Sequence, residues 1–226
     1  FADTDSDLMI DIQLSLHHHK WQLDKAWRYW LVMVGFGGTI NNGQSPVEMC
    51  NGLQPDIFKE FEKYDYRIKR SEEDFEMEIF DKETGEKLVS GISNWLLVDL
   101  QKRRLMPIKN FTMRKAPEKT SAHDCIPLTK ILVPDNLEKL GERKILYSDI
   151  DGNGHMNNAR YGAFVIDALP EEFQNICFTD FKIYYNKEAV QGQMLEIFGS
   201  IDSEHRKIFI LGKQGNVNCF ESELYY

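Results

Sequence analysis

The sequence KILYSDIDGNGHMNNARYGAFVIDALP, residues 144–170, decides the fold expected of this chain. It begins with a short apolar run at 144–147 and continues through a turn rich in Asp, Gly and Asn. Apolar residues at helical spacing then run up to the final proline. We expect a strand at 144–147 and a helix over 158–169, capped by Asn157 or Asn158 and ended by that proline.

Four strand-like segments follow this helix, near 178–187, 193–201, 207–212 and 217–225. A turn at 213–216 joins the last two. One strand, one helix and then a run of antiparallel strands predict an α+β unit in which a curved sheet wraps around the helix.

The first half of the chain repeats this order loosely. A strand-like segment near 8–16 precedes the stretch 20–36, where large apolar residues at mixed three- and four-residue spacing predict a helix. Strands over 66–99 follow, and the clearest alternation lies in a hairpin at 75–99 that turns at 82–85. The predicted architecture is therefore two copies of one α+β unit, each a central helix wrapped by a curved antiparallel sheet.

The two units are separated by a stretch that shows little periodicity. Four of the seven prolines fall between residues 105 and 140, which is typical of a connector. The predicted division is 1–108 for the first unit, 109–140 for the connector and 141–226 for the second unit.

Composition excludes several classes of protein. The 226 residues carry a formal charge of −9, which argues against a non-specific nucleic-acid binder. The longest apolar run, residues 30–38, is far shorter than the roughly 20 residues of a membrane span. Four cysteines without a CxxC pair indicate neither a zinc site nor a disulfide framework. Reduced thiols in a cytosol are the simplest interpretation.

The polar turn contains part of a calcium-loop pattern. Asp149, Asp151, Asn153 and Gly154 occupy positions 1, 3, 5 and 6 of an EF-hand loop. Position 12 must supply a bidentate Glu, and here it is Arg160. We therefore reject a calcium site.

Two interpretations of the turn remain open on the residues alone. It can be a tight strand-to-helix corner, because Asp, Asn and Gly favour turns and helix caps. It can also be a hydrolytic site, with backbone N–H groups at the helix start holding an oxyanion beside Asn153 and His155. A thioester suits so small a set of groups, since its thiol leaving group has a pKa of about 8.5.

Three strings of residues in the second half resemble the acyl-acyl carrier protein thioesterases of fatty-acid synthesis. They are Asp149-x-Asp151-x-Asn153-x-His155-x-Asn157-Asn158-x-x-Tyr161, then Leu169-Pro170, then Tyr185-Asn186-Lys187-Glu188. In the first half the resemblance rests on Asp81 to Gly85, Ser93-x-Trp95, Arg103-Arg104 and Pro107. It covers about residues 66–108 and 141–200, and it implies a fold of two tandem hotdog domains.

The resemblance also implies the catalytic residues. Asp151, Asn153, His155 and Glu188 match the catalytic residues of the family. By analogy, Glu188 activates water with the aid of His155, Asn153 orients the reacting groups, and Asp151 holds the constellation in place. Neither a metal nor a cofactor is implied.

Four further residues are candidates for substrate binding. Asn157 and Asn158 lie next to the predicted catalytic string, and Trp27 and Trp30 form either an acyl-pocket wall or part of the core. The sequence departs from the family between about residues 39 and 63, which leaves the chain-length preference undefined.

The implied partner is an acyl carrier protein bearing a phosphopantetheine-linked fatty acyl chain. From Lys102 to Lys119 there are seven cations and one anion, a basic stripe suited to an acidic carrier or a phosphate. A solvated linker is the alternative for the stripe. For the whole protein, the alternatives are an acyl-CoA thioesterase and a non-catalytic acyl-binding module. A homodimer is possible, and we expect a bacterial cytoplasmic location, or the plastid stroma if a transit peptide has been removed.

Overall fold

The computed structural model describes the backbone at residues 5–16, 64–70, 74–99, 104–105, 125, 128–150 and 154–226. It describes side chains at 78–94, 125, 128–150, 154–158 and 160–226. Several predictions lie outside these residues: the helix at 20–36 with Trp27 and Trp30, the divergent stretch 39–63, and the side chains of the basic stripe.

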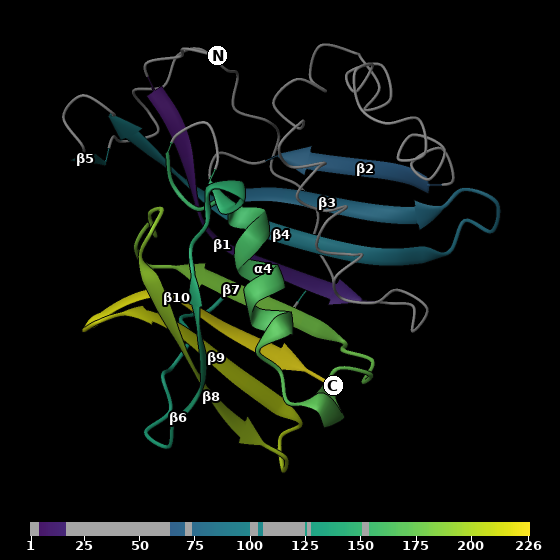
Figure 1. The fold of residues 1–226 in the computed structure, drawn as a ribbon. Helices are drawn as coiled ribbons and strands as arrows, with labels where there is room; N and C mark the ends of the chain where they lie inside the picture. The colour runs from purple at the N-terminus through teal and green to yellow at the C-terminus, as the bar shows by residue number, and fades with distance from the viewer. Residues whose placement is uncertain are drawn as a thin grey trace.

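The described chain forms one antiparallel sheet of ten strands with one α-helix on its face (Figure 1). The strands of the first half are β1 (Asp5–Leu16), β2 (Tyr64–Arg70), β3 (Asp74–Asp81), β4 (Lys87–Asp99) and β5 (Arg104–Leu105). The second half holds β6 (Glu138–Lys144), α4 (Asn158–Asp167), β7 (Asp180–Tyr185), β8 (Met194–Asp202), β9 (Lys207–Gln214) and β10 (Val217–Tyr225). Two short 3-10 segments, η2 (Tyr147–Asp149) and η3 (Glu171–Phe173), flank the helix.

The strand order shows how the two halves are related. It runs β2-β3-β4-β1-β7-β10-β9-β8-β6, with β5 beside β4. In the first half β1 pairs with β4, and in the second half β7 pairs in the same way with β10. β1 and β7 then pair with each other, from Asp11↔Tyr184 to Ser15↔Asp180, and so join the halves into one sheet.

This order corrects the predicted repeat in one respect. The sequence order suggested that the segment near 8–16 corresponds to the strand before α4, but β1 occupies the inner position that β7 holds in the second half. β6, by contrast, lies at the outer edge beside β8. The residue patterns explain the difference, because apolar residues alternate along β1 whereas β6 is mostly charged and exposed.

The predicted strand at 144–147 is wrong. The strand before the helix is β6, which ends at Lys144, and residues 147–149 form η2. An edge strand with mainly exposed side chains has no apolar alternation to mark it, so the apolar run that follows it was mistaken for the strand.

The predicted helix is confirmed, and its last two expected residues lie beyond α4. Phe164 and Val165, exposed at 1% and 0%, face the sheet and pack in a core that includes Phe181, Ile183 and Leu195. On the opposite face of β9, its residues Phe209 and Leu211 pack with Ile131 in a smaller cluster. Both faces of the sheet are therefore buried in this region.

The remaining strand predictions are confirmed by β7, β8, β9 and β10 and by the β3–β4 hairpin. In that hairpin, Asp81 Oδ1 accepts the N–H groups of Glu83 and Thr84, and Gly85 takes a φ of +71°. The left-handed conformation favours glycine at this turn.

Close contact between neighbouring strands makes Gly212 sensitive to substitution. A Cβ at Gly212 would clash with the ring of Phe220, which is fully buried. We expect Gly212→Ala to lower the free energy of unfolding by about 1–3 kcal/mol, as overpacking does. Urea denaturation measures this. The matched control is Gly141→Ala in β6, where a Cβ meets nothing within 4 Å; equal losses in the two variants would refute the packing explanation.

Within the described residues, no helix is long and apolar enough to cross a membrane. The cysteines described there, Cys125, Cys177 and Cys219, are free thiols.

Candidate active site

Two of the residues implied by the resemblance meet in the structure. His155 Nε2 lies 3.1 Å from Glu188 Oε2. The side chain of His155 is 33% exposed and that of Glu188 is 54% exposed, so water reaches both. His155 precedes α4, and Glu188 follows β7.

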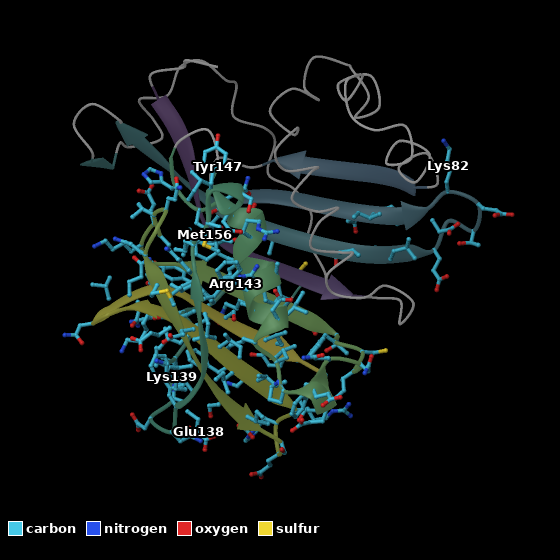
Figure 2. All side chains as sticks on the ribbon, in the orientation of Figure 1. Lys82, Glu138, Lys139, Arg143, Tyr147 and Met156 are labelled. Atoms are coloured by element: carbon cyan, nitrogen blue, oxygen red, sulfur yellow. The ribbon has the colours of Figure 1, made fainter. Side chains whose placement is uncertain are left out.

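Backbone pairing next to these residues brings them together. The N–H of Met156 donates to the C=O of Ala189 at 2.8 Å. Met156 is 2% exposed and Ala189 is fully buried, so this bond is protected from water. Figure 2 shows Met156 at the N-terminal end of α4, where the helix meets the sheet. The pair His155–Glu188 thus stands at the edge of a buried junction.

The segment that carries Glu188 is anchored to β10. The carbonyl of Cys219 accepts the N–H groups of Asn186 at 2.9 Å and Lys187 at 3.1 Å. A shift of register between Asn218 and Phe220 leaves Cys219 out of the β9–β10 pairing. This bulge turns the Cys219 carbonyl toward the segment.

The loop that carries His155 is closed at its base. Ile150 and Met156 form an antiparallel bridge, and the N–H of Asn157 donates to the C=O of Asp149 at 2.8 Å. Gly154, just before His155, has a φ of +83°, a conformation that favours glycine. Asp151 and Asn153, the other two predicted catalytic residues, fall in this loop but outside the described residues.

A buried ion pair ties the loop to the helix. Asp149 is 1% exposed, and its Oδ1 accepts the Nε–H of Arg160 at 2.8 Å. Its Oδ2 accepts the N–H of Leu146 at 2.9 Å. Both carboxylate oxygens are thereby engaged by donors.

The start of α4 is only partly available for an oxyanion. The N–H of Asn157 donates to Asp149, and the N–H of Arg160 donates to the C=O of Asn157 at 2.8 Å. Tyr185 Oη donates to the C=O of Asn158 at 3.4 Å. Burial raises the pKa of Tyr185 well above its usual value, with a further contribution from Tyr161, so the phenol stays a neutral donor.

The two asparagines at this end differ in exposure. Asn157 is exposed and Asn158 is half-buried in the first turn of α4. Both lie at the same end of the helix as His155.

Lys187 places a positive charge directly before Glu188 in the chain. Burial raises the pKa of the Cys219 thiol above its usual value, and the positive charge of Lys187 offsets part of that rise. Lys187 therefore lies close enough to this buried region to influence it, directly beside Glu188 in the chain.

Sequence reasoning missed the residues that hold the site in place. In the sequence, Arg160 stands out only as the residue that excludes calcium, and Tyr161 only as part of the resemblance. A cation in the first turn of a helix is unfavourable with respect to the helix dipole, which was a signal that Arg160 has a carboxylate partner. The hydroxyl of Tyr161, which accepts the N–H of Ala189 at 3.1 Å, left no such signal.

Comparisons with known proteins identify relatives of this half of the chain. Residues 135–219 match the family model for the acyl-ACP thioesterase C-terminal domain. A search of curated protein sequences found no match.

Two solved structures share the fold. An acyl-ACP thioesterase from Bacteroides thetaiotaomicron is 16% identical, with a TM-score of 0.61 over 98% of this chain and 76% of that one. A 12:0-ACP thioesterase from Umbellularia californica is 13% identical, with a TM-score of 0.60 over 98% of this chain and 75% of that one. Residues 135–219 are therefore similar in sequence to the C-terminal domain of the acyl-ACP thioesterases, and the chain shares its fold with two solved thioesterases of that name.

Proposed function

We propose that this protein hydrolyses fatty acyl-acyl carrier protein thioesters, releasing a free fatty acid and the carrier thiol. The observation that carries the proposal is the contact of 3.1 Å between His155 Nε2 and Glu188 Oε2. It joins an imidazole and a carboxylate, both reached by water, inside the part of the chain that matches the family. A carboxylate that lies beside an imidazole and is reached by water can act as a general base in hydrolysis.

In the proposed reaction, Glu188 takes a proton from water as the water oxygen attacks the thioester carbonyl. His155 holds the carboxylate in place through its ring N–H. When the tetrahedral intermediate collapses, the C–S bond breaks and the thiolate takes up the proton held by Glu188. A thiol with a pKa of about 8.5 leaves readily, so no second acid is needed.

Other roles in the proposal come from the resemblance. Asn153 orients the reacting groups, and Asp151 holds the constellation. Asn157 and Asn158 contact the substrate near the thioester, and the acyl chain runs toward Trp27 and Trp30.

The proposed architecture is two tandem hotdog units. The strand order supports it, since β2-β3-β4-β1 in the first half is the counterpart of β8-β9-β10-β7 in the second. The first unit would shape the acyl pocket and the second would supply Glu188. The protein would act where carrier-linked acyl chains are made, in a bacterial cytoplasm or a plastid stroma, as a monomer or a homodimer.

Thiol release from a graded panel of acyl-carrier proteins and acyl-CoAs tests the proposal. We expect carrier-linked acyl groups to be cleaved at least tenfold faster, in kcat/KM, than CoA-linked groups of the same length. The basic stripe would supply the difference, so raised ionic strength should narrow it. Faster cleavage of CoA esters would make the protein an acyl-CoA thioesterase. Retention of acyl groups without thiol release, by folded protein, would make it a binding module.

A further inference from the structure

We propose that Tyr161 is a positioning residue, whose hydroxyl holds the segment carrying Glu188 in register with His155. The inference rests on the proposed role of Glu188 as the base. It concerns the α4 side of the junction, where one side chain reaches across to the chain beyond β7.

The contact fixes the peptide that follows Glu188. Tyr161 is 2% exposed, and its Oη accepts the N–H of the fully buried Ala189 at 3.1 Å. That N–H belongs to the peptide group whose carbonyl is supplied by Glu188. Because a peptide group is planar, holding its N–H also orients the backbone of Glu188.

The ring of Tyr161 is itself held on two sides. It packs edge to face against Tyr185, with centroids 5.3 Å apart, and against Phe220, with centroids 5.4 Å apart. Phe220 is fully buried beside the Cys219 bulge. A ring so confined presents its hydroxyl at a fixed point, which is what a positioning role needs.

The other anchors of this segment are backbone groups. Cys219 C=O accepts the N–H groups of Asn186 and Lys187, and Ala189 C=O accepts the N–H of Met156. Substitution leaves such bonds in place, whereas Tyr161→Phe removes one acceptor and keeps the ring. The segment should then settle in a shifted position, with Glu188 displaced from His155.

Steady-state kinetics of Tyr161→Phe provide the first test. We expect kcat to fall about tenfold with KM within twofold, because misplacing a base slows chemistry more than binding. In the Glu188→Gln background, Tyr161→Phe should cause no further fall, since the base it positions is already gone. The matched control is Ser222→Ala, which removes another buried hydroxyl bonded to the backbone, to Ile210 C=O at 3.2 Å. It should leave kcat within twofold.

Amide hydrogen exchange tests the anchor without any activity. We expect the Ala189 amide to exchange at least tenfold faster in Tyr161→Phe than in the wild type, with the amides of β8 and β9 unchanged. Unchanged protection of Ala189 would overturn the anchor.

The kinetic outcomes separate this inference from the proposed function. Full activity of Tyr161→Phe, with Glu188→Gln inactive, would overturn the positioning role and leave the base standing. An equal fall in both backgrounds would also overturn it, because the effect would then be merely structural. Full activity of Glu188→Gln would remove the base itself, and the positioning role with it.

Discussion

Glu188→Gln should lower kcat by about 10²–10⁴-fold, the usual contribution of a general base. The amide keeps the shape of the carboxylate and can still contact His155, but it cannot accept a proton from water. Since the side chain is 54% exposed and carries no buried charge, the variant should fold normally. Thiol release from the best carrier-linked donor measures the effect, and thermal denaturation checks the fold.

A matched control separates the base from a general loss of surface charge. Glu172→Gln changes an exposed glutamate in η3, beyond the other end of α4, and should leave kcat unchanged. A fall of less than tenfold in Glu188→Gln would remove Glu188 from the role of base. Equal falls in both variants would point to a lost charge on the whole molecule instead.

The fold was predictable where a strand alternates between two environments or is bounded by a clear turn. β8 alternates between buried and more exposed side chains, whereas β9 and β10 are buried on both faces and are marked by the turn that joins them. β6 escaped because an edge strand with exposed charged side chains follows no such pattern. The position of β1 in the sheet was not predictable for another reason. Sequence order does not determine which strands pair, and β1 is placed by its long-range pairing with β4 and β7.

For the candidate site, the sequence predicts residue types, but their geometry is visible only in the structure. The Asp, Asn, Gly and His content of the loop indicated either a corner or a hydrolytic centre, and the resemblance implied Glu188. The meeting of His155 and Glu188 depends on the backbone bond between Met156 and Ala189, which any pair of residues could make. The anchoring side chains, Arg160 and Tyr161, become visible as anchors only when their partners are in place.

Two consecutive residues of α4 hold the two halves of the site. Arg160 reaches Asp149 at the base of the loop that carries His155, and Tyr161 reaches Ala189 next to Glu188. Neighbouring helical residues point about 100° apart, so one turn of helix can brace two separate segments. The first turn of α4 therefore stabilises both segments.

Arg160→Ala should lower the free energy of unfolding by about 3 kcal/mol, the lower end of the cost of breaking a buried pair. The lower end applies because the Arg160 side chain is 39% exposed while that of Asp149 is 2% exposed. The loss comes mainly from Asp149, whose carboxylate would stay buried with a single donor, the N–H of Leu146. Urea denaturation measures it, and Lys139→Ala, which breaks an exposed pair with Glu196, should change the midpoint little.

The decisive comparison adds Asp149→Asn to Arg160→Ala. Asparagine keeps an oxygen that can accept the N–H of Leu146 but carries no charge, so the double variant should be more stable than Arg160→Ala alone. If the double variant is instead less stable, the cost lies in lost packing of the Arg160 side chain and not in a stranded charge. In that case the Asp149–Arg160 ion pair would not stabilise the loop. The backbone hydrogen bonds of Asn157 and Met156 would then hold His155 in place by themselves.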